Sequence, residues 1–323
     1  MSLFAEKSKK VSVVNGGTPV LWREPVNIKS RNLFYGPGSA ALAPAAPFRF
    51  IEEDTDGGSP KFKVRDAKNV EWSVKLGPEA QPETVATRLV WAVGYFAEEA
   101  YYFDRVVVKN LPLLSRGRDH VEGRNVVRGA RFEPRRNNVK RGETWDWDKN
   151  PFSESRELNG LKVIMILLNN FDARPKNNHV LMVRGSRRGR LESRYVVTDI
   201  GATLGRTGGL GGGRSKNDLE DFRSAQFVVG VKDDRTVEFK YRTRPRKLGL
   251  LTVLYPPYYM GQAKTERDMG GIPAKHARWI GSLLSRLSDN QLRDAFRAAG
   301  YDRATIAGYV GAIRQRINLL IEL

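Results

Sequence analysis

NNFDARPKNN, residues 169–178, places four asparagines, one aspartate and one lysine directly after an apolar run. That run, residues 155–168, carries its large aliphatic side chains at helical spacing and predicts a buried helix. Because Asn and Asp side chains compete with the backbone for hydrogen bonds, a polar loop at this point is unfavourable unless its groups have partners. The pattern therefore predicts a functional loop at the end of a core helix.

Short strands follow this loop. Residues 179–183 and 194–199 predict a hairpin around the turn RGSRRGR, and the second strand ends at Asp199. Residues 201–218 contain too many glycines for regular structure, and residues 274–323 predict two or three amphipathic helices. We therefore expect the second half to be mostly helical, with the loop and the hairpin in its middle.

The first half predicts strands and one helix. From Phe48, short β-prone runs alternate with turn clusters at 54–60 and 66–69, which indicates a small antiparallel sheet. Residues 82–95 then have helical spacing, and residues 101–108 predict another strand.

Two further segments lack a regular pattern. Residues 113–142 are rich in arginine and predict irregular structure, while residues 1–46 are rich in Gly, Pro and Ala and predict an extended arm with little structure of its own. Within the arm, Trp22, Phe34 and Tyr35 are the expected anchors to the body of the protein. The chain thus has strands with a helix, then a strand, then a helical half, which is the order of a two-lobed kinase.

Phosphoryl transfer needs a glycine turn over phosphates, a lysine held by a helix glutamate, and a catalytic loop. In the first half, Gly57, Gly58, Ser59 and Lys61 form a turn whose backbone N–H groups can approach an anion. Lys75 lies on the next predicted strand, and Glu83 heads the following helix as its counter-ion. The candidates for nucleotide binding are therefore Gly57, Gly58, Ser59, Lys61, Lys75 and Glu83.

The second half supplies the catalytic and metal-binding candidates. Asp172 can accept a hydroxyl proton, and Lys176 can neutralise charge that develops on the γ-phosphate. Asn177 and Asp199 offer the hard oxygen ligands that Mg²⁺ prefers. Each motif is weak by itself, and their order along the chain carries the prediction of a site for ATP and Mg²⁺.

These residues also carry a family resemblance. The turn Gly57-Gly58-Ser59-Pro60-Lys61 resembles the G-x-Q-P-K phosphate loop of HipA-like kinases, with Ser59 in place of the glutamine. PETVATRLVWAVGY is similar to their Glu-led helix, and NNFDARPKNN is similar to their N-x-D-x-H-x-K-N loop, with Arg174 replacing the histidine. The resemblance spans about Phe48 to Asp199 and extends loosely to atypical kinases of the phosphatidylinositol kinase type. The two departures remove no group that touches metal or the γ-phosphate.

The resemblance implies an α+β, two-lobed protein-kinase-like fold. Residues 1–46 would be the arm, residues 47–112 a small antiparallel β-rich N-lobe with one helix, and residues 113–323 a larger, mostly helical C-lobe. The implied function is a kinase that moves the γ-phosphate of Mg-ATP to a hydroxyl acceptor such as a protein Ser or Thr. The alternatives are a non-catalytic pseudokinase, a basic nucleic-acid-binding module, and AMP transfer from the same nucleotide site.

Composition restricts the partners less than the motifs do. The net charge is +19, from 55 Lys and Arg against 36 Asp and Glu, and arginine concentrates in residues 105–141, 184–194 and 235–247. These stretches predict a basic surface that suits an acidic protein or small-molecule substrate; nucleic acid is less favoured because no helix-turn-helix, zinc-finger or aromatic strand motif accompanies them. The absence of cysteine excludes disulfides and thiolate catalysis. Because no apolar run is long enough to span a bilayer and no secretory signal precedes the first strand, we expect a cytoplasmic protein.

Overall fold

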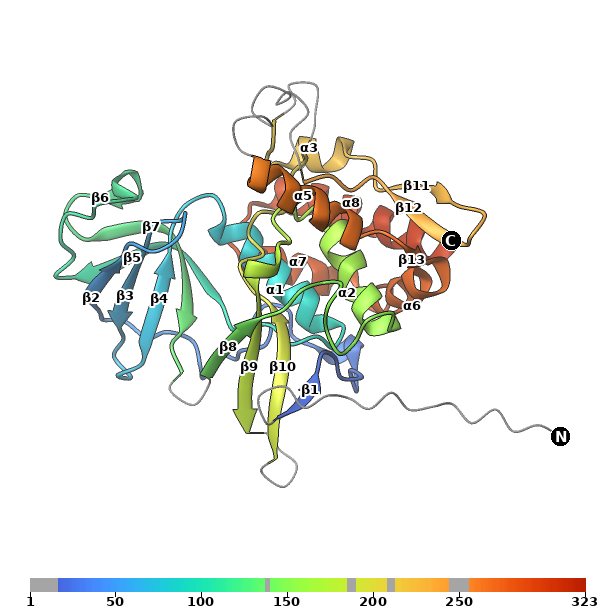
Figure 1. The fold of residues 1–323 in the computed structure, drawn as a ribbon. Coiled ribbons are helices and arrows are strands. Elements are labelled where there is room, and N and C mark those ends of the chain that lie inside the picture. The colour runs from blue at the N-terminus through green and yellow to red at the C-terminus, as the bar shows by residue number, and fades with distance from the viewer. Residues whose placement is uncertain (1–16, 137–139, 185–189, 208–212, 244–255) are drawn as a thin grey trace.

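Two separate hydrophobic cores organise the chain. The computed structural model describes residues 17–136, 140–184, 190–207, 213–243 and 256–323. One core lies within a strongly curved β-sheet, and the other lies among the helices and a second sheet on the opposite side of the molecule (Figure 1). The architecture is therefore mixed α and β.

The first sheet closes on itself. Its strands, in order across the sheet, are β4 (Glu71–Lys75), β3 (Lys61–Arg65), β2 (Phe48–Asp54), β5 (Tyr101–Lys109), β7 (Val126–Pro134) and β6 (Val121–Glu122). Because β4 also pairs with β7, five strands form a ring around the buried Phe62, Val74 and Phe132. The strands β2, β3 and β4 are antiparallel, as their turns predict, whereas β2 and β5 run parallel.

The prediction of irregular structure for residues 113–142 is wrong over the part that the structure describes. This region contains the 3₁₀ turn η2 (Arg118–His120), β6, β7 and β8 (Lys140–Thr144), and β7 pairs with both β5 and β4. The buried side chains of β7, Val127 and Phe132 among them, are separated by arginines that obscure the strand pattern in the sequence. The sheet therefore continues past residue 112, where the predicted N-lobe ends.

A second sheet has the order β1 (Thr18–Val20), β10 (Leu191–Val197), β9 (Asn178–Arg184) and β8. The hairpin of β9 and β10 confirms the sequence prediction; residues 185–189 of its turn lie outside the described residues. Strand β1 comes from the predicted arm and pairs in parallel with β10.

From residue 17 onward the arm is packed against the rest of the protein. The expectation that it has little structure of its own is therefore wrong for this part. It contains β1 and the 3₁₀ turn η1 (Ile28–Ser30), and Leu21, Ile28 and Leu33 are buried in the helical core. Trp22 Nε1 also donates a hydrogen bond to the carbonyl oxygen of Val93 at 2.7 Å. Apolar anchors thus hold a segment whose composition suggests a free arm; residues 1–16 lie outside the described part.

The helices of the described residues surround α2. They are α1 (Ala80–Ala92), α2 (Arg156–Leu167), α3 (Leu219–Ser224), α5 (Pro256–Asp268), α6 (Ala274–Leu284), α7 (Asp289–Arg297) and α8 (Arg303–Glu322). A small third sheet contains β11 (Val228–Val231), β12 (Thr236–Phe239) and β13 (Ile272–Pro273). The helices α6, α7 and α8 confirm the predicted helical end, whereas α3, α5 and the third sheet are not evident from the sequence.

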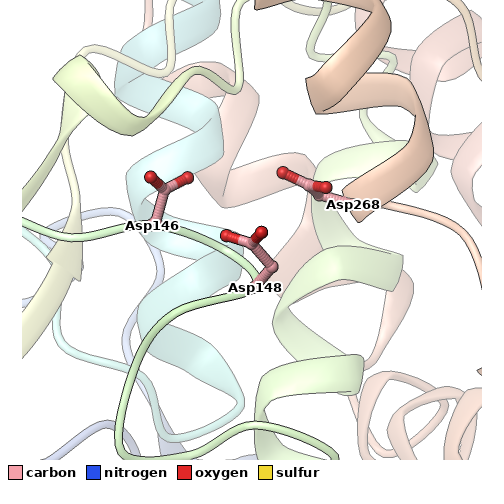
Figure 2. Close-up of side chains that lie close together, drawn as sticks. All are labelled: Asp146, Asp148 and Asp268. Carbon is pink, nitrogen blue, oxygen red and sulfur yellow. The ribbon is translucent and has the colours of Figure 1, made fainter.

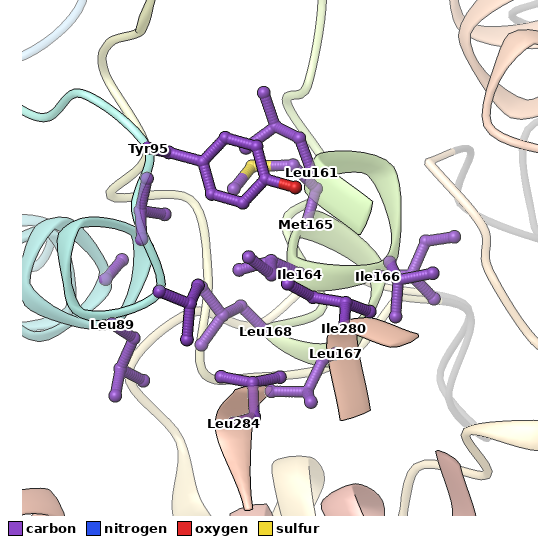
Figure 3. Close-up of a cluster of buried hydrophobic side chains, with 14 of the residues drawn as sticks. Leu89, Tyr95, Leu161, Ile164, Met165, Ile166, Leu167, Leu168, Ile280 and Leu284 are labelled. Atoms are coloured by element: carbon purple, nitrogen blue, oxygen red, sulfur yellow. The ribbon is translucent and has the colours of Figure 1, made fainter. Parts of the chain in front are cut away.

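Helix α2 is the centre of the larger core. Figure 3 shows its Leu168 near Leu89 of α1 and Leu284 of α6, with its Ile164 next to Ile280 of α6. Tyr95, just after α1, donates a hydrogen bond from its hydroxyl to the carbonyl oxygen of Glu157 at 2.6 Å. The hydrogen bond holds the first turn of α2, and the packing of Ile164 and Leu168 holds its end, and therefore the start of the polar loop, against the helix that carries Glu83.

Candidate functional site

A cleft of about 1130 Å³ lies between the first sheet, α1 and the second sheet. It is lined by all ten residues that the sequence motifs single out, which are Gly57, Gly58, Ser59, Lys61, Lys75, Glu83, Asp172, Lys176, Asn177 and Asp199. The fold thus brings together residues from five separated segments; their individual roles stay predictions.

Lys75 is the centre of the charge network in this cleft. Its ammonium lies 2.9 Å from Glu83, 2.6 Å from Asp199 and 2.8 Å from Glu79, and its side chain is only 9 % exposed. Burial opposes the charge of Lys75, but the carboxylates of Glu83, Asp199 and Glu79 together raise its pKa well above the ordinary value. Lys75 is therefore a fixed cation that joins β4, α1 and the end of β10.

Glu79 is a member of this network that the sequence analysis missed. It accepts hydrogen bonds from Ser59 Oγ at 3.0 Å and from Lys216 Nζ at 2.6 Å, in addition to its pair with Lys75. Burial opposes its ionisation, yet the two lysines lower the pKa of Glu79 to about 2. No local rule indicates this contact, because Lys75 ends the strand β4 and Glu79 is the residue before α1. Glu79 thus connects the glycine turn to the segment that follows Asp199.

A second missed group lies behind Glu83. Arg131 of β7 is buried, with one guanidinium nitrogen 3.0 Å from Glu133 and another 3.6 Å from Glu83. Burial opposes this charge, but Glu83 and Glu133 raise the pKa of Arg131. Burial and the nearby Glu133 also raise the pKa of Glu98, although Arg141 pairs with it at 2.8 Å. The arginine-rich segment therefore contributes directly to the wall of the cleft.

The polar loop is held by its own side chains. Asn177 Nδ2 donates to the carbonyl oxygen and to Oδ2 of Asp172, at 2.7 and 3.0 Å, and the backbone N–H of Asp172 donates to Asn170 Oδ1 at 3.0 Å. Arg174 forms an ion pair with the other carboxylate oxygen of Asp172. Arg174, which replaces the histidine of the kinase motif, thus orients Asp172 directly. Lys176, two residues after Arg174, is exposed.

Asp199 follows β10 in a left-handed backbone conformation, with φ of 51°. This conformation is uncommon for residues other than glycine, and aspartate is among the side chains that tolerate it best. It turns the half-exposed carboxylate back toward Lys75 across 124 positions of sequence.

The glycine turn between β2 and β3 is open toward the cleft. Gly57 has φ of 74°, and a Cβ at Gly58 would meet no atom within 4 Å. Arg116 supports the turn from behind, since its guanidinium donates to the carbonyl oxygens of Gly57 and Asp54 at 2.7 and 2.9 Å. Lys61 lies beside the turn and forms no ion pair with any described residue.

A group of three carboxylates lies outside this cleft. Asp146 and Asp148, between β8 and α2, approach Asp268 at the end of α5, and their oxygen atoms lie within 4.8 Å of one another (Figure 2). Lys264 contacts all three, at 2.8, 3.0 and 2.6 Å. Its ammonium is therefore a cation shared by all three carboxylates. The neighbouring Trp145 and Trp147 are buried in the core.

Comparisons with known proteins give little information about this chain. No family model matches the chain, and a search of curated proteins finds no match. Among solved structures, the chain is similar to the proinflammatory kinase CtkA of Helicobacter pylori, with 13% identical residues and a TM-score of 0.44. The alignment covers 85% of this chain and 96% of that chain. At this TM-score the likeness carries no argument, and the resemblance to HipA-like kinases rests on the motifs alone. No helix of the described residues is long and apolar enough to cross a membrane.

Proposed function

We propose that this protein is an ATP-dependent phosphotransferase that moves the γ-phosphate of ATP to a hydroxyl acceptor. The observation that supports this function best is the meeting of Lys75, Asp172 and Asp199 in one cleft, each from a different segment. Phosphoryl transfer is catalysed mainly by positioning and by charge stabilisation, and this arrangement offers both.

The charges of the cleft indicate where phosphates bind. Lys75 already faces three carboxylates, whereas Lys61 and Lys176 form no ion pair with a described residue. These two lysines are therefore the cations available to a new anion. Lys61 would contact the phosphates beside the open Gly57 and Gly58 turn, and Lys176 would approach them from the polar loop.

The residues also fit a magnesium ion. Asn177 uses its side-chain Nδ2 to hold Asp172, so its side-chain Oδ1 is left to bind an ion, and Asp199 offers a half-exposed carboxylate. Oxygen donors of these two kinds are what Mg²⁺ binds alongside phosphates and water. The ion would supply positive charge against the β- and γ-phosphates.

Asp172 is the proposed proton acceptor. In the transfer, the acceptor oxygen would form a bond to the γ-phosphorus while its proton passes to Asp172, and the bond to the β–γ bridging oxygen would break to release ADP. Asn177 and Arg174 hold the carboxylate in place for this step. Arg174 is a positioning residue in this scheme.

The nucleoside would lie on the part of the cleft formed by β9 and its neighbours. Leu181 and Val183 alternate along β9 on the face that lines the cleft, and Leu181 lies between Arg141 of β8 and Arg194 of β10. This surface offers a flat base both aliphatic side chains and guanidinium groups. In this scheme the two cores belong to two kinase-like lobes, and the smaller lobe extends to Pro134.

The nucleic-acid alternative is less well supported by the side-chain contacts. Arginines of residues 105–141 form ion pairs with glutamates in the described structure, and these include Arg105, Arg128, Arg131, Arg136 and Arg141. Because these arginines are already paired with glutamates, less positive charge is available to bind the phosphates of a nucleic acid than the sequence suggests.

The test uses the full chain with Mg²⁺ and γ-labelled ATP, and the acceptor is the protein itself or an added protein mixture. We expect Asp172→Asn to lower transfer by about 10² to 10⁴-fold, the usual contribution of a general base, while nucleotide binding measured by calorimetry is retained. Asp233→Asn, an exposed aspartate outside the cleft, is the matched control and should transfer normally. Transfer that survives Asp172→Asn would refute the assignment.

Two further outcomes would replace the proposal. Label transferred from α-labelled ATP would indicate AMP transfer from the same site. Mg-ATP binding with no transfer from either label would indicate a pseudokinase.

A further inference from the structure

A second cavity, of about 280 Å³, lies beside Asn169 at the start of the polar loop. It shares no lining residue with the cleft. Arg206 and Ser224 form one part of its wall, and Lys240, Tyr241 and Arg242, which follow β12, form another. We call these six residues the basic pocket.

The basic pocket has an uncompensated positive charge. Three cations line it, and no carboxylate does so among the described residues. Lys240 and Arg242 form no ion pair with any described residue, while the guanidinium of Arg206 donates a hydrogen bond to the neutral Ser224 Oγ, at 3.2 Å, and forms no ion pair with a described residue. This differs from the cleft, where Lys75 and Arg131 face glutamates. Gathering three cations without an anion is electrostatically unfavourable, and a bound anion would remove that penalty.

The backbone that carries these cations is held in place. Tyr241 Oη donates to the carbonyl oxygen of Asn170 at 2.5 Å, and the N–H of Lys240 donates to the carbonyl oxygen of Phe227 at 2.8 Å. On the opposite wall, Asn169 Nδ2 donates to the carbonyl oxygen of Gly205, one residue before Arg206, at 2.8 Å. These hydrogen bonds fix the backbone that carries the cations around the cavity, which lowers the loss of backbone entropy on binding an anion.

We propose that the basic pocket binds a phosphate monoester group. A guanidinium can contact two phosphate oxygens at once, and the pocket offers two guanidiniums, one ammonium and a serine hydroxyl to a group with three terminal oxygens. At ~30 Å³ per water molecule the cavity holds the equivalent of about nine waters, which is enough for a phosphate and part of the group that carries it. The proposal does not depend on ATP binding in the cleft.

The experiment measures binding of inorganic phosphate to the full chain by calorimetry, at constant ionic strength maintained with chloride. We expect the double variant Lys240→Ala/Arg242→Ala to bind phosphate at least about tenfold more weakly, since each lost charged hydrogen bond is worth that much or more. The control Arg223→Ala/Lys232→Ala removes the same charge from exposed positions that do not line the pocket, and should bind as the wild type does. All four positions are on the surface, and thermal unfolding without phosphate checks that each variant folds.

A further variant separates this site from the cleft. Lys61→Ala/Lys176→Ala removes the unpaired cations of the cleft and should retain phosphate binding in the basic pocket. The proposal is overturned if phosphate does not bind the wild type, if the pocket variant binds it normally, or if only the cleft variant loses it. The same measurement with a phosphoserine peptide distinguishes a free phosphate from a phosphorylated polypeptide as the ligand. If a phosphorylated polypeptide is the ligand, the peptide should bind more tightly than inorganic phosphate.

Discussion

Glu79→Gln tests the charge network of the cleft quantitatively. The Glu79 side chain is 16% exposed and contacts Lys75 and Lys216, and its pKa lies at about 2 instead of 4.5. This difference corresponds to about 3 kcal/mol of stabilisation at pH 7 from the ionised form. Glutamine retains the shape of the side chain but lacks the charge, so we expect the variant to lose up to that amount of unfolding free energy.

The pH dependence gives this prediction its sign. A carboxylate whose pKa is lowered by folding stabilises the protein fully above its unfolded pKa, and the contribution is lost as the pH falls through the folded value. The difference in unfolding free energy between wild type and Glu79→Gln should therefore decrease from about 3 kcal/mol at pH 7 to about 1.4 kcal/mol at pH 3.

Urea unfolding monitored by tryptophan fluorescence at several pH values measures this gap. Glu52→Gln is the matched control, because Glu52 is 57% exposed, pairs only with Lys63, and should contribute less than about 1 kcal/mol. A gap for Glu79→Gln that stays below about 1 kcal/mol at pH 7, or that does not narrow in acid, would refute the assigned network.

Two predictions concern other ion pairs. Arg174→Ala should reduce kcat of the proposed transfer by about tenfold or more with little change in KM for ATP, because Asp172 loses the group that orients it. Arg174→His should restore part of the rate if orientation is the reason. An unchanged kcat for the alanine variant would contradict the role. Lys264→Met should lower the unfolding free energy by about 1 to 2 kcal/mol at pH 7, because three carboxylates lose their shared cation in a partly exposed site. This loss should diminish in acid, where the carboxylates are protonated, and urea unfolding that shows no such recovery would contradict the explanation.

Local patterns predicted much of the secondary structure. The turns between β2, β3 and β4, the helix α2 and the hairpin of β9 and β10 all follow from apolar periodicity and turn residues in short windows. β7 was missed because its buried Val127 and Phe132 alternate with arginines, which in isolation indicate exposed structure. The charge of the buried Arg131 is balanced by Glu133 of the same strand and by Glu83 of α1, and the second partner is not visible in a local window.

The polar loop, the glycine turn and the aspartate after β10 are therefore properties of the sequence itself, since each depends on neighbouring residues. The tertiary structure alone decided that Lys216 joins Glu79, that Arg131 approaches Glu83, and that Arg206 lines one cavity with Lys240 and Arg242. These contacts link side chains through folding of distant segments, as Lys75 and Asp199 do across 124 positions. Periodicity within a segment indicates which face is buried but does not indicate which distant charge that face will meet.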